Sequence, residues 1–548
     1  MRFRFRFPAL RRWGLDEKET TGLAVVLLLV FAAYSRSLLD GFVFDDFPQI
    51  VFNHPLRHWS FVWLSWTHEH WWFSGPSKGP HAPYYRPVQN TFLALAFPIA
   101  GTNPLIWHLV KITLHLTVVA LAFRFSQLLT ANTAASLLAA LLFGVITVHA
   151  EPVVWISAYH EPLTAIFELG AFCTFISRSR GRPSGLLLPL LLFALAAFAH
   201  ESAVVFPALI AAYVFLIDSD IDADRSGHDS RHKFACLRSR FAQAFLLGAL
   251  FAVIDLLYMG ARFFVLGRGA FLGISRKAAK FYLVGNRILI RESVVNAPAP
   301  QILYTVPLAI ATYLEVFVMP WLAGPTHPVR LVTTRGLENF YRPLGALLLL
   351  ALFGYSLLHR KIYAKLYLFC VIWWFINLLP ALDLNQVVSL VQDRYEYIPS
   401  IGLCILAGDL SVRLATNGAR WQRVIALGLS GFVAVQLVAL WRIEAVWHDN
   451  QTLFTRCLEI LPDSIFYREQ LAAVLRSRGD LAGTAKQLTI AAESNPDNYS
   501  IHSQLVELYT QMGRKADADQ EFRAYLRSIA PWSLGAGSRK PTRPPRHD

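Results

Sequence analysis

The chain has 548 residues, of which 55% are hydrophobic and 16% are charged. Soluble domains carry about 25% charged residues, and their apolar residues do not gather into runs of membrane length. The composition excludes a disordered chain, a collagen and a disulfide-stapled secreted domain. It predicts an all-α fold whose main part is a polytopic helical domain in a bilayer.

The charge of the chain carries a topological signal. The formal net charge is +14, and the basic residues lie mainly in short loops between apolar runs. This placement orients membrane proteins, so the charge does not indicate a nucleic-acid partner. The cysteines form no CxxC pair and indicate neither a disulfide framework nor a thiolate metal site. They are Cys173, Cys236, Cys370, Cys404 and Cys457.

Twelve hydrophobic segments are long enough to cross a bilayer core of roughly 30 Å as tilted helices. The basic segment 1–19 has no small-residue cleavage site, so we expect a retained first span and a cytoplasmic N-terminus. The domain 20–446 then carries outer loops at 40–103 and 260–342. The segments begin near residues 20, 104, 133, 153, 184, 201, 241, 302, 343, 363, 397 and 422.

The segment from Ile302 to Leu322 decides the number of spans. Pro307 interrupts it, so we expect it to lie at the membrane interface or to re-enter. The basic loops around Arg360 and Arg413 face the cytoplasm only if this segment does not cross. About 11 spans result, and everything after Trp447 lies outside the cytoplasm.

Residues 447–531 show a period of 34 residues. Gly479 and Gly513 lie 34 residues apart, at the expected turns between paired helices. This period predicts a small tetratricopeptide-repeat α-solenoid, with two unrelated helical hairpins as the alternative. The basic, Pro-rich tail 532–548 is predicted to be disordered. The prolines that close the repeat units are Pro462, Pro496 and Pro531.

The first outer loop contains two adjacent acids, Asp45 and Asp46, within an aromatic-rich stretch. Neighbouring carboxylates near an apolar interface repel each other and lose hydration, so the pKa of one should rise. Such a carboxylate is a candidate general base towards a hydroxyl, and the pair is a candidate ligand for a divalent cation. The alternative is a solvated turn whose acids cap the next helix.

Three further pairs of ionisable residues are expected at the outer ends of spans. Ionisable residues near membrane depth are costly and are functional candidates by default. The spacing excludes an HExxH zinc site, because Thr164 and Val204 stand where the second histidine would be. For His68-Glu69-His70 we favour a solvated loop over a metal site. The three pairs are His149 with Glu151, His160 with Glu161, and His200 with Glu201.

Cations form a second candidate group on the outer side. The segment from Arg262 to Arg291, which includes Lys280 and Arg287, mixes basic and apolar residues. It predicts an interfacial amphipathic helix that holds either a lipid-linked phosphate or anionic headgroups in general. Arg394, just before a span, faces phosphate or snorkels at the helix end.

Four stretches in this order, followed by the repeats, resemble a known family: FVFDDFPQIVFNHPL, YYRPVQNTFLALAF, VHAEPVVWIS and DRYEYIPSIG. They resemble the transmembrane and tetratricopeptide-repeat O-mannosyltransferases and their bacterial relatives, of the GT-C class. The resemblance implies a catalytic acidic pair at Asp45 and Asp46. It also implies substrate contacts at Arg86, Arg394 and Tyr397. Relatives often carry other residues where this chain has His160-Glu161 and His200-Glu201, which leaves the sugar and the acceptor open.

The resemblance implies the reaction as well. A polyprenyl-phosphate sugar, mannose or another hexose, would transfer in one inverting displacement to a hydroxyl, expected on a protein Ser or Thr. No cofactor is certain, and a divalent cation stays open. The repeats would bind the acceptor outside a bacterial inner membrane. The alternatives are transfer to a lipid or cell-envelope glycan, or a non-catalytic transporter or scaffold.

Overall fold

The computed structural model describes residues 16–74, 84–178, 183–218, 230–267, 299–329, 344, 354, 363–382 and 391–535. Within these ranges every regular element is a helix, as the sequence predicts. The longer helices of the first half are α2 (Glu17–Tyr34), α3 (Ser60–Thr67), α4 (Pro87–Ala100), α5 (Pro104–Thr130), α6 (Thr133–Val145), α7 (Ala150–Val154), α8 (His160–Arg178), α9 (Leu187–Ala199) and α10 (Phe206–Tyr213). They are followed by α12 (Ser230–Leu266), α15 (Ala299–Val318), α17 (Ala364–Leu378), α18 (Ser400–Ala415), α19 (Ala419–Glu444), α20 (Asn450–Ile460), α21 (Ile465–Ser477), α22 (Leu481–Ser494), α23 (Tyr499–Gln511) and α24 (Lys515–Gly535).

Several of these helices make the chain a multi-pass membrane protein. Six are long and apolar enough to cross a bilayer, and a seventh span results if α6 and α7, bent by 55°, count as one. The segments near 184 and 302 form shorter apolar helices, and most of the segment near 343 lies outside the described residues. The expected total of about 11 spans therefore stays a prediction. The six spans are Glu17–Leu39, Pro104–Thr130, Glu201–Asp218, Arg238–Leu266, Ala364–Leu382 and Ala419–Trp447.

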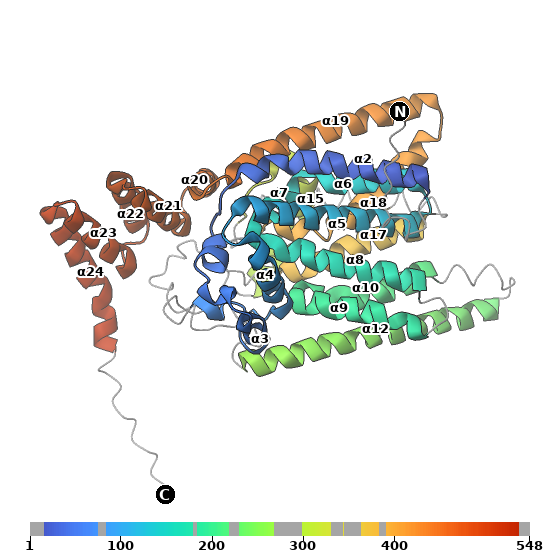
Figure 1. Cartoon of the computed structure of the whole chain (residues 1–548), viewed down its shortest axis with the longest axis horizontal. Coiled ribbons are helices and arrows are strands. Elements are labelled where there is room, and N and C mark those ends of the chain that lie inside the picture. Colours follow the sequence, from blue (N-terminus) through green and yellow to red (C-terminus); the bar gives the residue numbers. More distant parts are fainter. Residues whose placement is uncertain are drawn as a thin grey trace, which may run out of the picture.

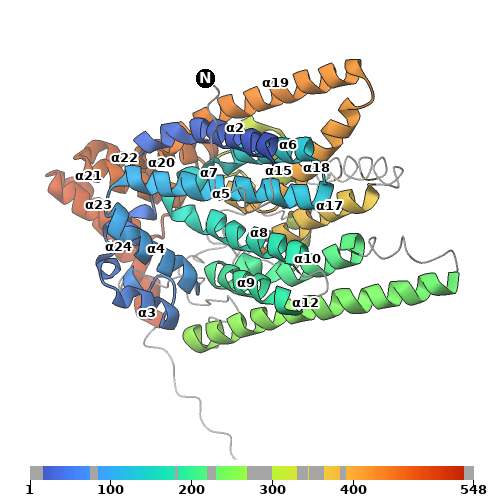
Figure 2. The same ribbon diagram turned by 45° about the vertical axis from the view of Figure 1, so that its right-hand side comes forward.

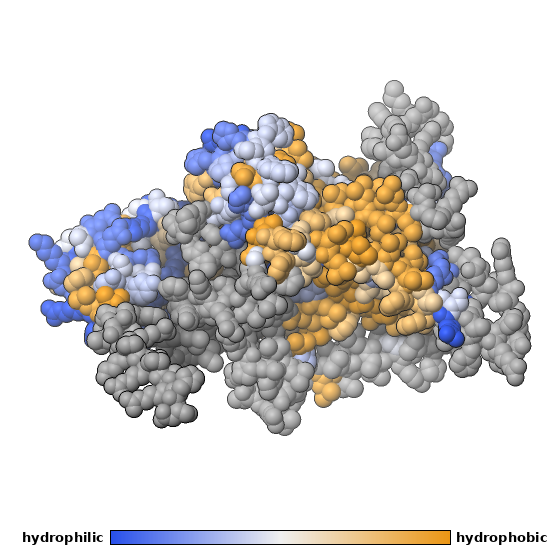
Figure 3. Space-filling view, turned by 90° about the horizontal axis from the view of Figure 1, so that it is seen from below, coloured by the Kyte–Doolittle hydropathy of each residue, from blue (hydrophilic) through white to orange (hydrophobic). Residues whose placement is uncertain are grey.

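The outer surface of the helix bundle is apolar, as lipid contact requires. Helix α12 runs along one flank of the bundle beside α9 and α10 (Figure 2). Seen from below in Figure 3, a broad hydrophobic area is bordered at its ends by hydrophilic residues. A bilayer would cover such a band, with the polar groups at the water interfaces. Exposed apolar side chains on α12 include Phe241, Phe245, Leu246, Leu256, Leu257 and Phe264.

Small residues let the inner helices approach closely. Gly408 on α18 lies against the backbone of α6, where an added Cβ would stand 2.6 Å from the carbonyl oxygen of Ala135 and 3.0 Å from the nitrogen of Ala139. Helices in membranes associate through such close backbone packing. The contact of α6 with α18 fixes the helix ends that carry candidate site residues.

The first outer loop and the C-terminal helices lie at the same end of the bundle. Figure 1 shows α3, α4 and α20 to α24 at this end, with the start of α2 at the other. The backbone N–H of Gly41 donates to the carbonyl of His448 at 3.1 Å, and Asp40 and His448 contact each other at 2.8 Å. The loop and the end of α19 therefore form one unit.

The C-terminal helices pair as the 34-residue period suggests. Helix α21 packs on α22, and α23 packs on α24. Gly479 and Gly513 stand in the two turns with φ of 82° and 72°, a backbone conformation that favours glycine. Ser464, Asp480 and Asn498 cap the helices that follow them. The assignment of these hairpins to the tetratricopeptide class stays a prediction.

Replacing Gly408 by alanine should destabilise the bundle. The new Cβ meets the backbone of α6, and overpacking of this kind costs about 1–3 kcal/mol. We expect a lower apparent Tm for detergent-solubilised G408A in a tryptophan-fluorescence melt. The matched control is G428A on α19, where nothing lies within 4 Å of an added Cβ. Equal Tm values for the two variants would contradict the close contact.

Candidate active site

The two adjacent acids occupy different environments. Asp46 is buried, and its Oδ2 accepts from the N–H of Val43 at 2.9 Å. Its Oδ1 accepts from the N–H and the Oγ of Ser157 at 2.7 and 2.5 Å. Asp45 is partly exposed, and among the described residues no hydrogen bond occupies its carboxylate. Asp46 is thus held by the protein, whereas Asp45 is accessible to a ligand.

The turn before the acids contains a residue in an uncommon conformation. Phe44 has φ of 47°, in the left-handed region that bulky side chains rarely enter. Its N–H donates to Oδ1 of Asn450 at 2.7 Å, and its ring packs 5.9 Å from those of Trp155, Phe454 and Phe466. A conformation of this kind costs about 1–3 kcal/mol and persists only where its surroundings enforce it. These contacts enforce it beside the acidic pair.

Both acids have pKa values close to neutral. Burial, followed by the charge of Asp46, raises the pKa of Asp45 to about 7, against the attraction of Arg394. Burial raises the pKa of Asp46 to about 6, although hydrogen bonds from Ser157 and Val43 favour its ionised form. Interacting acids titrate as a pair. Near pH 7 this pair includes a carboxylate with the pKa that suits a general base.

Two arginines, Arg86 buried and Arg394 partly buried, form ion pairs with glutamates. Arg394, in the 3-10 turn η14 (Asp393–Glu396), donates from Nη1 and from its backbone N–H to Glu151, at 2.5 and 3.0 Å. Arg86, at the start of α4, donates from Nε and Nη2 to Glu201, at 2.8 and 2.5 Å. Each pair joins segments more than 100 residues apart. Each guanidinium is fixed in direction by its carboxylate.

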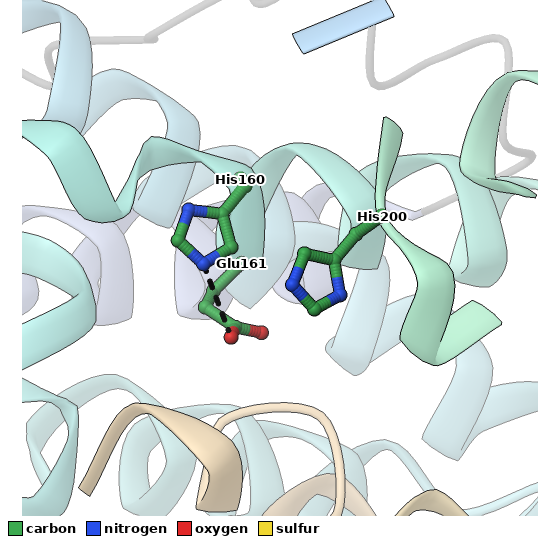
Figure 4. Close-up of side chains that lie close together, drawn as sticks. All are labelled: His160, Glu161 and His200. Carbon is green, nitrogen blue, oxygen red and sulfur yellow. Dashed lines mark ion pairs between the residues drawn. The ribbon is translucent and has the colours of Figure 1, made fainter. Parts of the chain in front are cut away.

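His160, Glu161 and His200 form a second cluster. The first two residues begin α8, and the third follows α9. All three are buried, and one ligand atom from each lies within 4.8 Å of the other two. Figure 4 shows Glu161 contacting His160, with His200 beside them. Arg394 is close enough to act electrostatically on Asp45 and Glu161, so the cluster and the acidic pair belong to one charged region.

Sequence reasoning missed Lys111, in the first half of α5. The residue is buried, and its Nζ donates to the carbonyl of Pro152 at 2.6 Å. Its charge acts on both Asp46 and Glu161. The signal was present, because a lysine inside an apolar span is a functional candidate by default.

His149 and Tyr397 lie inside the helix core. His149 contacts the carbonyl of Phe143 at 2.7 Å and the Oγ of Ser400 at 2.9 Å. The hydroxyl of Tyr397 contacts Nδ1 of His115 at 2.7 Å. Their polar atoms therefore join α5, α6 and α18 rather than line an open site. Two other predicted site residues, Lys280 and Arg287, lie outside the described residues.

Three tryptophans of the first outer loop form an exposed aromatic surface. Trp59, Trp63 and Trp66 line an open groove with Val62 and Leu95, and the first two are 70% and 72% exposed. Tryptophan favours the membrane interface. The groove therefore suits an anchor for the first outer loop at the bilayer surface.

Comparison with known proteins supplies a resemblance over most of the chain. No family model matches. The chain is 22% identical over 529 residues to protein O-mannosyl-transferase TMTC3 of Homo sapiens, which covers 93% of this chain and 55% of that protein. It is 24% identical over 489 residues to protein O-mannosyl-transferase TMTC4 of Mus musculus, at 84% and 65% coverage. The chain is similar to protein O-mannosyl-transferases. The family resemblance inferred from its motifs is confirmed.

The comparisons also set the limits of that similarity. The chain spans about half the length of human TMTC3. Among solved structures, the apo oligosaccharyltransferase of Archaeoglobus fulgidus matches with a TM-score of 0.39 and 16% identity, over 84% of this chain and 60% of that chain.

Replacing the two acids by asparagine should separate their roles in stability. Asparagine has one acceptor oxygen, so D46N leaves a buried donor of Val43 or Ser157 without a partner, at a cost of about 1–3 kcal/mol. D45N removes a partly exposed charge that repels Asp46, and it removes no described hydrogen bond. We expect D46N to lower the apparent Tm at pH 7 and D45N to leave it equal or raise it. A larger loss in D45N would contradict the assignment of Asp46 as the held acid.

Proposed function

We propose that the chain is a membrane glycosyltransferase that moves a sugar, mannose or another hexose, from a polyprenyl phosphate to the hydroxyl of a protein Ser or Thr. The observation that carries the proposal is the accessible Asp45 carboxylate, with a pKa near neutral, within electrostatic reach of the partly buried Arg394. The similarity to protein O-mannosyl-transferases supports the reaction class.

Asp45 is the general base in this proposal. It takes the proton of the acceptor hydroxyl while the hydroxyl oxygen bonds to the anomeric carbon. The bond from that carbon to the phosphate oxygen breaks, the lipid phosphate leaves, and the configuration inverts. Asp46, held by Val43 and Ser157, keeps the turn in place. A positioned base contributes about 10²–10⁴-fold to the rate.

In this proposal the arginines bind the phosphate of the sugar donor. A guanidinium presents five N–H donors in a planar fork, which suits phosphate oxygens. Arg394 and Arg86 each use part of this fork on a glutamate, and the carboxylate fixes the direction of the rest. We place the lipid phosphate against Arg394, because Arg394 is the one of the two arginines whose charge lowers the pKa of Asp45. Lys280 and Arg287 are proposed as further phosphate contacts.

In this proposal the C-terminal helices bind the acceptor protein. Repeats of the proposed tetratricopeptide class stack helix pairs into binding surfaces. Helices α20 and α21 contact the turn that carries Asp45 through Phe454 and Phe466. An acceptor chain held there would reach the base. We place this end of the bundle in the periplasm of a bacterial inner membrane, opposite the basic N-terminus.

A cysteine at Ser503 tests this orientation. Ser503 is exposed on α23, whereas the described native cysteines are buried. In a chain whose Cys236 is serine, we expect an impermeant maleimide to label S503C in intact spheroplasts. Labelling only after permeabilisation would place the repeats in the cytoplasm. The parent chain without S503C gives the background.

A transfer assay tests the reaction. Purified chain is incubated with a polyprenyl-phosphate mannose and Ser/Thr peptides, and product is measured by mass. D45N should lose about 10²–10⁴-fold in rate, while E17Q at the far end of α2 keeps the wild-type rate. The wild-type rate should rise as pH increases through about 7, because the base must be ionised.

Other outcomes discriminate the alternatives. Transfer to glycan or lipid but not peptide would reject the protein acceptor. Movement of the lipid-linked sugar across vesicles without any transfer would identify a transporter. A D45N variant that is folded and as fast as wild type would reject Asp45 as the base.

A further inference from the structure

The cluster at the start of α8 has the composition of a metal site. We propose that His160, Glu161 and His200 bind one first-row transition-metal dication, with zinc as the preferred ion. The three residues are 7%, 4% and 6% exposed, and their candidate ligand atoms lie within 4.8 Å of one another. Two come from one helix start and the third from another segment, as Figure 4 shows. The helix ends therefore fix the side chains from two directions.

The carboxylate of Glu161 is incompletely satisfied by the protein. Its Oε1 is buried without a hydrogen-bond partner among the described residues, and its distance to Nε2 of His160 is 3.5 Å. Glu151 and Glu201 differ, because each has an arginine within hydrogen-bond distance. A buried charge is costly unless it is paired or bound to a metal. A cation between Glu161 and the two imidazoles would supply the missing partner.

The second contacts of the two histidines differ. Nδ1 of His160 lies 3.3 Å from the carbonyl of Ser157, and when its Nδ1–H donates to that oxygen, Nε2 keeps its lone pair for a metal. Nδ1 of His200 accepts the backbone N–H of Ser202 at 3.2 Å and lies 2.7 Å from the Oγ of the same serine, so binding through Nε2 of His200 requires the other tautomer, with Nδ1–H donating to that Oγ. Metal-ligating histidines almost always carry such an outer partner, which fixes the tautomer.

The donor set selects the class of ion. Two imidazole nitrogens and one carboxylate oxygen are ligands of catalytic zinc, with a fourth position open to water or substrate. Calcium and magnesium prefer oxygen ligands throughout. Zinc–nitrogen bonds of about 2.0–2.1 Å require ligand atoms about 3.3 Å apart, so binding would draw the three side chains closer together.

The site would act next to the acidic pair. Ser157 contacts both groups, since its carbonyl meets His160 while its N–H and Oγ donate to Asp46. A dication would add positive charge to a region where Arg86 and Arg394 are paired with glutamates and where Lys111 also acts on Glu161. Its open position suits an anionic oxygen, such as that of a phosphate.

Cobalt and zinc titrations test the proposal on the full chain. The protein is purified in detergent through a tag without histidine, stripped with a chelator and titrated with Co²⁺. We expect one equivalent to bind with visible d–d bands of low-coordinate geometry, which Zn²⁺ then removes. H160Q, E161Q and H200Q should each bind about 100-fold more weakly or not at all, and S202A about 10-fold more weakly.

The control H54Q removes an exposed imidazole of the first outer loop and should bind as wild type. Zinc should also raise the apparent Tm of wild type and H54Q but not of H200Q, because it binds only the folded site. Absence of a Co²⁺ spectrum in folded wild type would overturn the proposal. So would an unchanged spectrum in both H160Q and H200Q. None of these measurements needs sugar transfer, so the metal site and the proposed reaction can fail independently.

Discussion

The buried carboxylate of Asp46 is the interaction on which the candidate site depends. It accepts three hydrogen bonds from two segments that lie 111 residues apart, the first outer loop and the break between α7 and α8. A carboxylate in a weakly hydrated site needs such donors, because leaving it unpaired costs several kcal/mol. The same three bonds fix the direction of the neighbouring Asp45. One buried charge therefore joins the loop to the bundle and presents the second acid.

Ion pairs between glutamates and arginines fix the arrangement of the rest of the candidate site. Glu151 with Arg394, and Glu201 with Arg86, form short pairs between distant segments. Buried ion pairs add little net stability over apolar residues of the same volume, yet breaking one is costly. Their value here is positional, because each arginine can point in only one direction. Among the described residues Glu161 has no arginine within hydrogen-bond distance; the charges of Arg394, Arg86 and Lys111 act on it only from further away, and the proposed metal would be its direct cationic partner.

The sequence predicted which polar residues belong to the candidate site better than it predicted which of them form ion pairs with each other. Polar residues at the ends of apolar runs are visible in one dimension, so Asp45 and the three histidine–glutamate pairs were candidates. Which carboxylate meets which arginine depends on packing between distant helices and could not be inferred. The metal candidate was missed because HExxH describes one helix, whereas His200 comes from another. The 34-residue period predicted the turns at Gly479 and Gly513, since glycine is favoured where φ is positive.

The C-terminal helices help to hold the turn that carries the acidic pair. Phe44 adopts its left-handed conformation between Trp155 of the bundle and Phe454 and Phe466 of α20 and α21. The side-chain oxygen of Asn450, the first residue of α20, accepts a hydrogen bond from the backbone N–H of Phe44. Holding this conformation costs about 1–3 kcal/mol, and much of the contact that offsets the cost comes from the C-terminal helices. A shift of α20 would therefore relax the turn and move Asp45. In this architecture a chain bound along the C-terminal helices is coupled directly to the position of the proposed base.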